Sequence, residues 1–482
     1  MRRKRTIYFN DARHYYMFIY EPPMRMRDAW APIDEIGGTA VDTFVYGVGR
    51  GDGLFYPSEK GLRFGADLEK MEIAPYWRVW ENMQSLIDRG LDPLTVLIDR
   101  AHDKGLDFFA SLRMGDCPGL DAKFSLEGGG RGYVHEEMRD HQFGVLEELA
   151  TRYATEGVEL DFAATPGGGS YWFAADEVEE HTPLMTDYIR RISQMVRQRP
   201  GQPGQVGARI YPTEELNLKT GLDVRAWLEE GLVDYVVPMT YLYTVLDSNM
   251  PLDWIVEAAH NNDASVYPML QPFYTDEERF RYNLEAAGPA MMRAAAANNW
   301  ARGADGHYTW FLKWPLGDAE RNTLSELGDR DVVFEGDKHF FLRRKTENEQ
   351  DIDAYLPLPL TQEEAGKRFQ LPFYIADDPT NPRVQTVTLR LAISDLVGAD
   401  KLDIRLNGAA LDDESCTRSG ILSIEPYMGQ WLDYDLQKVR PRQGDNVLEI
   451  TLVGRPTNIA SDLVVESLEV VIRYGMFPTH VD

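Results

Sequence analysis

Short apolar runs alternate with longer amphipathic stretches through the first two thirds of the chain. Runs of this length, rich in β-branched and aromatic residues, predict strands, and stretches with apolar residues three or four positions apart predict helices. Two such helices are MTDYIRRISQMVRQ (185–198) and LDVRAWLEEG (222–231), of which the second ends on a glycine, a common helix stop. The eight predicted strands are TIYFN (6–10), VDTFVY (41–46), LDFFASLR (106–113), GVELDF (157–162), VGARIY (206–211), VDYVVPM (233–239), SVYPMLQ (265–271) and GHYTWF (306–311).

The repeated strand–helix pattern predicts an α/β fold with a parallel sheet. Eight units over about 340 residues are the size of a (β/α)8 TIM barrel with a few loop insertions. We place the insertions at 115–137 and 164–183, after the third and fourth strands. A doubly wound open sheet is the alternative, but it usually has a glycine-rich phosphate loop after its first strand. The corresponding segment here, NDARHYY, contains no glycine, so a barrel is favoured.

The pattern changes near residue 340, where strands with alternating apolar positions replace the strand–helix units. The predicted strands are VQTVTLRLAI (384–393), LDIRLNG (402–408), NVLEITLVG (446–454) and LVVESLEVVIRY (463–474). Period-two strands separated by turns predict an antiparallel β-sandwich. We therefore expect a catalytic barrel over residues 1–335, followed by a sandwich over 336–482 that either braces the barrel or binds carbohydrate.

The composition of the chain excludes some classes of binding partner. The formal net charge of the 482-residue chain is -28 and its pI is about 4.7. Nucleic acids and anionic membrane surfaces both require a basic face, so neither is an expected partner. The two cysteines, Cys117 and Cys416, fit no metal or redox spacing. We expect no cofactor, and the oligomeric state is left open.

The chain is expected to be soluble. It has no apolar run approaching ~18 residues, the length that a transmembrane helix requires. Its basic N-terminus, MRRKRTIYFN, is not followed by the apolar region of a signal peptide. The expected location is cytoplasmic as the sequence is written, or secreted or periplasmic if a signal peptide has been removed.

The fourth predicted strand, GVELDF, carries two carboxylates on one face. Glu159 and Asp161 alternate with apolar residues and lie about 6.6 Å apart along an extended strand. Carboxylates this close require a nearby cation to remain ionised together, and Arg113 and Arg209 on the neighbouring strands are candidates. We take Asp161 as the catalytic nucleophile or base and Glu159 as the group that tunes it. The alternative for Glu159 is a structural salt bridge inside the barrel.

Other strand ends supply further candidates, because catalytic residues of a barrel project from the carboxyl ends of its strands. Asp116, after the third strand, is the candidate general acid, although a loop-capping role would also explain it. Asp11 and His14 follow the first strand and are assigned to substrate binding. They lack an evident third ligand, so we expect no metal.

Aromatic and amide groups complete the predicted cleft. Tyr241, Gln271 and Trp310 lie at the ends of the sixth, seventh and eighth strands. Rings stack on the apolar faces of sugars, and amides bind their hydroxyls, so we assign these residues to substrate binding together with Arg113 and Arg209. The sequence has no serine-hydrolase, zinc-protease or nucleotide-binding motif.

Three segments together resemble a known family. They are RDHQFGVLEELATRYATEGVELDF (139–162), SLRMGD (111–116) and GLDVRAWLEEGLVDYVVP (221–238), which are similar to bacterial proteins labelled "family 10 glycosylhydrolase-like". The resemblance covers most of residues 1–340. It implies a TIM barrel often followed by a β-sandwich, and carbohydrate hydrolysis with Glu159 and Asp161 in the cleft.

A second, weaker similarity concerns the chitinase-type motif of the fourth strand. Glu156, Glu159 and Asp161 follow its rhythm of alternate acids, but the next inward position is Ala163 where that motif has its catalytic Glu. Three hypotheses therefore stay open. They are a glycoside hydrolase of polysaccharides or oligosaccharides, a non-catalytic carbohydrate-binding barrel, and a lyase or isomerase of a sugar acid.

Overall fold

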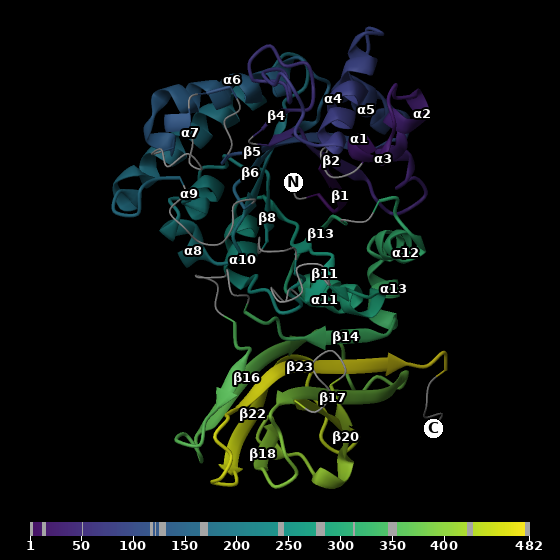
Figure 1. Cartoon of the computed structure of the whole chain (residues 1–482), viewed down its shortest axis with the longest axis vertical. Coiled ribbons are helices and arrows are strands. Elements are labelled where there is room, and N and C mark those ends of the chain that lie inside the picture. The colour runs from purple at the N-terminus through teal and green to yellow at the C-terminus, as the bar shows by residue number, and fades with distance from the viewer. Residues whose placement is uncertain are drawn as a thin grey trace. The chain divides into compact units, whose positions relative to one another are not determined.

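The computed structural model in Figure 1 falls into two compact units, which are described separately below. The first unit comprises Met1–Thr244, Pro251–Pro272 and Arg302–Gly328. The second comprises Val245–Met250, Phe273–Ala301 and Asp329–Asp482. The structure describes residues 3–11, 16–50, 52–115, 119–120, 122–124, 132–163, 172–239, 245–275, 285–311, 314–345, 354–421 and 428–477.

The first unit is built on a curled parallel sheet (Figure 1). Within the described residues it has nine strands, in the order β10-β13-β1-β2-β5-β6-β7-β8-β9. Their bounds are β1 (Arg5–Asp11), β2 (Thr43–Gly47), β5 (Asp107–Arg113), β6 (Gly157–Asp161), β7 (Gln205–Ile210), β8 (Tyr235–Pro238), β9 (Ser265–Val266), β10 (Met269–Leu270) and β13 (Gly306–Thr309). Each of the eight segments predicted as barrel strands therefore contains a strand.

The seventh predicted segment contains two short strands instead of one. Tyr267 and Pro268 separate β9 from β10, and a proline has no backbone N–H to donate to a sheet. The strand β9 pairs with β8, whereas β10 pairs with β13. The two ends of the strand order are thus neighbours in the sequence.

Helices follow the strands of this sheet along the chain. The predicted helix 185–198 lies inside α7 (Val178–Arg197), and 222–231 contains α9 (Val224–Glu229), where the Asp223 carboxylate accepts a hydrogen bond from the Ala226 N–H. No helix in the described part of the chain is both long and apolar enough to cross a bilayer. The other helices of this unit are α1 (Tyr16–Ile19), α2 (Met26–Ala29), α3 (Ala31–Asp34), α4 (Ala74–Ile87), α5 (Pro93–Asp103), α6 (Glu136–Thr151), α8 (Glu214–Lys219), α10 (Asp253–Asn261) and α12 (Asp318–Glu326). The shorter elements are β3 (Gly49–Arg50), β4 (Gly53–Leu54), η1 (Ala122–Phe124) and η2 (Gly132–Val134).

One face of the parallel sheet surrounds a core that is apolar at its centre. Ile7 and Phe9 of β1 belong to this core, so Asp11, two residues further along the same strand, faces the same side. The other members of the core are Val45, Phe109, Ala163, Tyr235, Val237, Met239, Tyr267, Met269, Tyr308 and Trp310. Ala163, two residues beyond Asp161, also belongs to this core, so the charged candidates are set within the apolar core and not above it.

The two larger antiparallel sheets among the described residues of the second unit share one apolar core. One has the order β14-β23-β17-β21-β20, with β15 also paired to β23, and the other has the order β16-β22-β18-β19. Each of the four strands predicted after residue 340 is present. The bounds are β14 (Lys338–Phe341), β15 (Leu358–Leu360), β16 (Arg368–Ile375), β17 (Val384–Ser394), β18 (Lys401–Leu406), β19 (Ala409–Ala410), β20 (Cys416–Gly420), β21 (Gly429–Asp435), β22 (Gly444–Gly454) and β23 (Leu463–Tyr474). The unit also holds β11 (Phe273–Thr275), β12 (Glu285–Ala286), α11 (Pro289–Ala301), α13 (Arg330–Glu335) and η4 (Asp413–Ser415).

Candidate functional site

Arg209 lies between the two carboxylates of β6. Its Nη2 donates to Asp161 Oδ2, and its Nε lies 3.2 Å from Glu159 Oε1. The three side chains are buried, with exposures of 4% for Arg209, 1% for Asp161 and 0% for Glu159. The β6–β7 register aligns Asp161 directly with Arg209, which accounts for the contact. One cation thus stabilises the ionised forms of two neighbouring carboxylates and offsets part of their charge.

Glu159 is held in place by three hydroxyl groups. Ser111 Oγ donates to Glu159 Oε1 at 2.8 Å, and Tyr308 OH donates to the same oxygen at 3.0 Å. Tyr235 OH donates to Oε2 at 3.2 Å. Burial raises the pKa of Glu159 above its usual value, while the nearby Arg209 opposes that rise. Glu159 is therefore a fully buried group held by several hydrogen bonds, which suits a positioning role.

Arg209 is also fixed by aromatic contacts. Its guanidinium carbon lies 4.2 Å from the centre of the Phe9 ring and 5.8 Å from that of Tyr308. Burial disfavours the charged form, but Asp161 and the other anionic neighbours raise the pKa of Arg209 above its usual value. The guanidinium therefore stays charged and stays in one orientation.

A second ion pair lies at the same end of the sheet. Arg113 Nη2, at the end of β5, is 2.8 Å from Asp11 Oδ2, at the end of β1. The intervening strand β2 places Gly47 beside Asp11, so no side chain from β2 separates the two strands there. Asp11 is buried, whereas the Arg113 side chain is 18% exposed. Arg113 is thus the more accessible member of the pair.

Gly207, like Gly47, leaves space between strands because it has no side chain. The strand register aligns Glu159, Gly207 and Tyr235 on three successive strands. A Cβ atom at Gly207 would overlap the phenol ring of Tyr235. The absence of a side chain at this position therefore lets the ring of Tyr235 cross β7 and reach Glu159.

Gln271 and Trp310 form a third buried pair. The indole Nε1 of Trp310 donates to Gln271 Oε1 at 2.7 Å, and both side chains are at least nine-tenths buried. The Trp310 ring also packs edge-on against Phe9, with ring centres 6.1 Å apart. Phe9 thus contacts both Trp310 and the guanidinium of Arg209.

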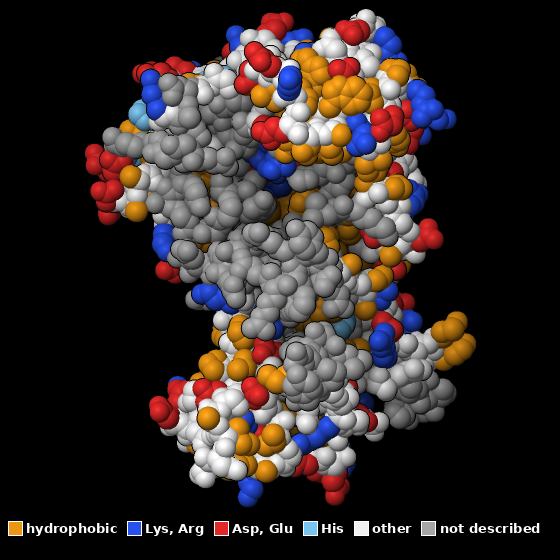
Figure 2. Space-filling model, in the orientation of Figure 1, with side chains coloured by type: hydrophobic (Ala, Val, Ile, Leu, Met, Phe, Trp, Pro, Cys, Tyr) orange, Lys and Arg blue, Asp and Glu red, His pale blue; other side chains and the backbone are white. Residues whose placement is uncertain are grey.

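The remaining predicted site residues, Asp116, His14 and Tyr241, lie outside the described residues. Asp161, Glu159, Arg209, Asp11, Arg113, Gln271 and Trp310 all belong to the strands of the parallel sheet or directly follow them. Figure 2 shows basic side chains at the bottom of a hollow near the centre of the first unit. In the described part of the chain, no group of three or more His, Cys, Asp and Glu side chains is arranged to hold a metal ion.

Three residues that sequence reasoning did not assign to the site are Ser111, Tyr235 and Tyr308. Each is two positions from a predicted or apolar inward residue: Ser111 from Arg113, Tyr235 from Val237 and Tyr308 from Trp310. Strand alternation places such residues on the inner face. That signal would have found them if every inward position had been examined, rather than only the strand ends.

Comparisons with known proteins do not give a family. A scan against protein-family models and a search of curated proteins each found no match. Structural comparison finds a cycloisomaltooligosaccharide glucanotransferase from Paenibacillus sp. at 9% identity and a TM-score of 0.37, covering 96% of this chain and 57% of that chain. An α-L-fucosidase from Vibrio sp. matches at 12% identity and a TM-score of 0.43, covering 97% of this chain and 96% of that chain.

A third structural match is a β-1,4-mannanase, at 13% identity and a TM-score of 0.39, covering 69% of this chain and 98% of that chain. The chain spans 57% of the length of the glucanotransferase. These neighbours are glycoside hydrolases and related enzymes, and their similarity is too distant to assign an activity. The case for a function therefore rests on the site itself.

Proposed function

We propose that the protein is a glycoside hydrolase that acts on a polysaccharide or oligosaccharide. The observation that carries the proposal is Asp161, a buried carboxylate at the carboxyl end of β6 that is paired with Arg209. Active sites of parallel α/β barrels lie at this end of the strands. We further propose that the sheet closes into a (β/α)8 barrel through β9 and β10, which are two residues apart in the sequence.

Asp161 is the proposed nucleophile or general base. Both roles require an ionised carboxylate, and an adjacent guanidinium favours that form. Glu159 acts through Arg209, since it touches the guanidinium and lies one layer deeper. It is therefore proposed as a positioning residue.

A glycosidase of this type needs a second carboxyl group as the proton donor. Asp116 remains the proposed acid. Asp11 keeps its proposed role in substrate binding, because its ion pair with Arg113 favours the carboxylate form, which has no proton to donate. A separation of ~5 Å between the two carboxyl groups would favour retention of configuration, and ~6.5–9.5 Å would favour inversion.

Sugar binding is assigned to the polar and aromatic groups around Asp161. Arg113 and Gln271 carry hydrogen-bonding groups for hydroxyls, and Trp310 offers an indole ring. His14 and Tyr241 are proposed for the same role from their sequence positions. Residues 1–335 form the proposed catalytic barrel, and 336–482 form a β-sandwich that serves as an accessory domain. Membership of the "family 10 glycosylhydrolase-like" group is part of this proposal.

One observation favours a second candidate, a barrel that binds carbohydrate without cleaving it. Arg209 already contacts both carboxylates of β6, so Asp161 is held in an ion pair before a ligand arrives. The charged groups of an ion pair can bind sugar hydroxyls without entering a covalent or proton-transfer step. Both candidate functions predict a carbohydrate ligand, but only the hydrolase predicts that the ligand is cleaved.

The test is a panel of polysaccharides and aryl glycosides, with two readouts. Release of sugar is measured by chromatography, and retention of the protein is measured by electrophoresis through polysaccharide gels. The hydrolase predicts release from at least one panel member. Retention without release would favour the binding candidate, and neither retention nor release across neutral and charged polymers would contradict both.

A further inference from the structure

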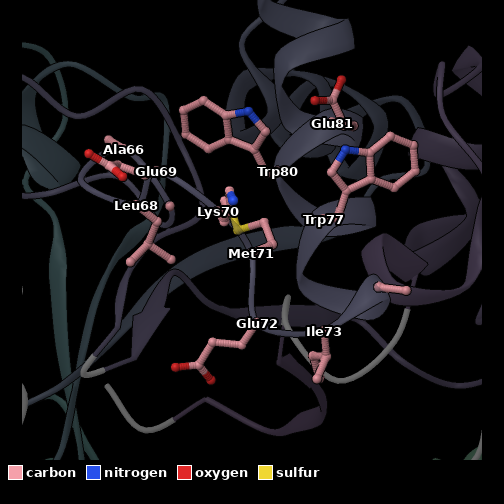
Figure 3. Close-up of a pocket in the computed structure, with 12 residues that line it drawn as sticks. Ala66, Leu68, Glu69, Lys70, Met71, Glu72, Ile73, Trp77, Trp80 and Glu81 are labelled. Atoms are coloured by element: carbon pink, nitrogen blue, oxygen red, sulfur yellow. The ribbon is translucent and has the colours of Figure 1, made fainter.

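A second hollow lies in the first unit, away from the ion pairs of β6 and β7. It has a volume of about 620 Å³ and is formed by residues 65–74 and the first turns of α4 (Figure 3). Pockets for small molecules and sugars usually have volumes of about 300–1,000 Å³. The hollow is therefore large enough for more than one sugar ring.

Two indole rings line this hollow. Trp77 and Trp80 are three residues apart on α4, so they lie on the same side of the helix. Trp77 is 46% exposed, which is unusual for the largest apolar side chain. Figure 3 shows the two rings around Met71, with Leu68 on the far side of the hollow. Leu68 and Ile73 are also exposed, so the surface is open to a ligand.

The ring of Trp80 is held rigidly. The Arg63 guanidinium carbon lies 4.3 Å from its centre, and Arg63 itself donates to Gln84 Oε1 at 3.0 Å. The backbone at Gly65 approaches the ring so closely that a Cβ there would lie 2.9 Å from Trp80 Cε3. A rigid aromatic surface loses little conformational entropy when a ligand stacks on it.

The polar groups of the hollow are mostly acidic. Glu69, Glu72 and Glu81 line it together with a single cation, Lys70. Within the described residues these three carboxylates form no ion pair, so their oxygens are available to accept hydrogen bonds from hydroxyl groups. Their charge would repel an anionic ligand. Neutral ligands that are rich in hydroxyl groups and have apolar faces would suit both the indole rings and the carboxylates of the hollow.

The hollow lies at the same end of the sheet as Asp161. The loop that contains residues 65–73 follows the carboxyl end of β2 and leads into the N-terminus of α4. Carboxyl ends of parallel strands share one edge, so this loop and the end of β6 are on the same side of the first unit. Figure 2 shows hydrophobic side chains gathered over the part of this unit that carries α4.

We propose that this hollow is a remote subsite for neutral sugar units of a polymeric ligand, with Trp77 as its stacking surface. The inference rests on the proposed function for the ligand class, but the subsite does not require cleavage. A polymer held at Trp77 and at the strand ends gains affinity from both contacts, because the second contact becomes intramolecular.

The experiment measures retention in gels that contain galactomannan, xylan, starch or mixed-linkage β-glucan, with polygalacturonate as an anionic polymer. Trp77→Ala is compared with the protein that keeps Trp77 and with Val332→Ala, whose side chain is 45% exposed on α13 of the second unit. All three carry Asp161→Asn so that the polymer stays intact. Circular dichroism and melting temperature check that each variant is folded.

The expected result is retention by at least one neutral polymer, weakened about tenfold by Trp77→Ala and unchanged by Val332→Ala. Polygalacturonate is expected to give no retention. Equal retention of Trp77→Ala and the control would overturn the subsite, whatever the result for sugar release. A concentration-dependent dimer that Trp77→Ala abolishes would also overturn the subsite, because the hollow would then be a contact between two copies of the protein. Retention that depends on Trp77, together with no sugar release from the same polymer by the protein that keeps Asp161, would keep the subsite and overturn the hydrolase.

Discussion

At the scale of single residues, Arg209 holds the candidate site together. It is the cation for two buried carboxylates, and it is itself fixed by the Phe9 ring. Removing one partner from a buried ion pair leaves an uncompensated charge, which costs more than the pair contributes when intact. Stability measurements on this residue therefore test the geometry independently of any substrate.

Arg209→Met is expected to lower the free energy of unfolding of the first unit by about 3–5 kcal/mol at neutral pH. Without the cation, the two carboxylates take up protons in the folded state at a higher pH than in the unfolded state. Stability of the variant should therefore fall as pH rises, and the loss should be smaller at pH 5 than at pH 8. Urea unfolding followed by tryptophan fluorescence measures both effects.

The matched control is Arg191→Met, which removes an exposed ion pair with Asp140. Surface pairs contribute about 0–1 kcal/mol, so the control should change stability by no more than that at either pH. A loss for Arg209→Met as small as that of the control would show that the ion-pair cluster does not exist as described.

Glu35 provides a pH-dependent prediction outside the site. Burial raises the pKa of Glu35 to about 8, while the Leu316 N–H and Tyr8 OH donate to its carboxylate and oppose that rise. Between about pH 4.5 and 8 the folded protein keeps a proton that the unfolded chain has released, so rising pH destabilises the fold. Glu35→Gln is neutral at every pH and should become more stable than the unchanged protein as pH rises from 5 to 8.

The melting temperatures of the two proteins at pH 5, 6.5 and 8 measure this difference. Glu229→Gln, on the exposed side of α9, is the control and should follow the unchanged protein. Parallel pH profiles for Glu35→Gln and the unchanged protein would contradict the assigned environment of Glu35.

Part of the candidate site could be predicted from the sequence at this scale. Strand alternation placed Glu159 and Asp161 on one face, and strand order placed Arg209 beside them, because both are local properties of a parallel sheet. The hydroxyl groups around Glu159 could not be placed in the same way. Tyr308 is 149 positions away from Glu159 and meets it only through the curl of the whole sheet.

At the scale of elements, the strands were predictable because apolar runs and turn residues can be recognised within short stretches of sequence. The break in the seventh strand at Pro268 follows from the missing N–H of proline. The pattern did not show which side chains reach across a neighbouring strand. Gly207 and Gly47 leave the space for these contacts. A glycine within a predicted strand does not by itself reveal which ring or ion pair lies over it.

Gly207→Ala tests this crossing. The new methyl group would overlap the phenol ring of Tyr235 inside a closely packed core, and overpacking typically costs about 1–3 kcal/mol. We expect a lower melting temperature and loss of the Tyr235–Glu159 hydrogen bond. Adding Tyr235→Ala should remove the overlap, so the double variant should lose less stability than the sum of the two single changes.

Gly144→Ala is the corresponding control within the same unit. It lies in α6, where an added Cβ would make only ordinary contacts with Lys60, and alanine favours a helix over glycine by about 0.5–1 kcal/mol. This control should be unchanged or slightly stabilised. Full additivity of Gly207→Ala and Tyr235→Ala would contradict the proposed crossing.

At the scale of the whole molecule, the chain passes between its two compact units more than once. Val245–Met250 and Phe273–Ala301 belong to the second unit although the first unit continues after each of them. Within the second unit, Asn298 explains part of this arrangement: its Nδ2 donates to the backbone oxygens of Ser248 and Tyr374, and its Oδ1 accepts from the Ala376 N–H. Local patterns could not predict these contacts, because they join segments that are distant in the sequence.

The central claim, that Asp161 carries out glycoside hydrolysis at the end of β6, is tested most directly by the rate of sugar release from Asp161→Asn. The substrate is the panel member that the unchanged protein cleaves, and Asp99→Asn, at an exposed position on α5, is the matched control. A catalytic carboxylate predicts a loss of about 10²-fold or more in kcat for Asp161→Asn, with the control unchanged and both variants folded. A folded Asp161→Asn variant that releases sugar at the rate of the control would contradict the account.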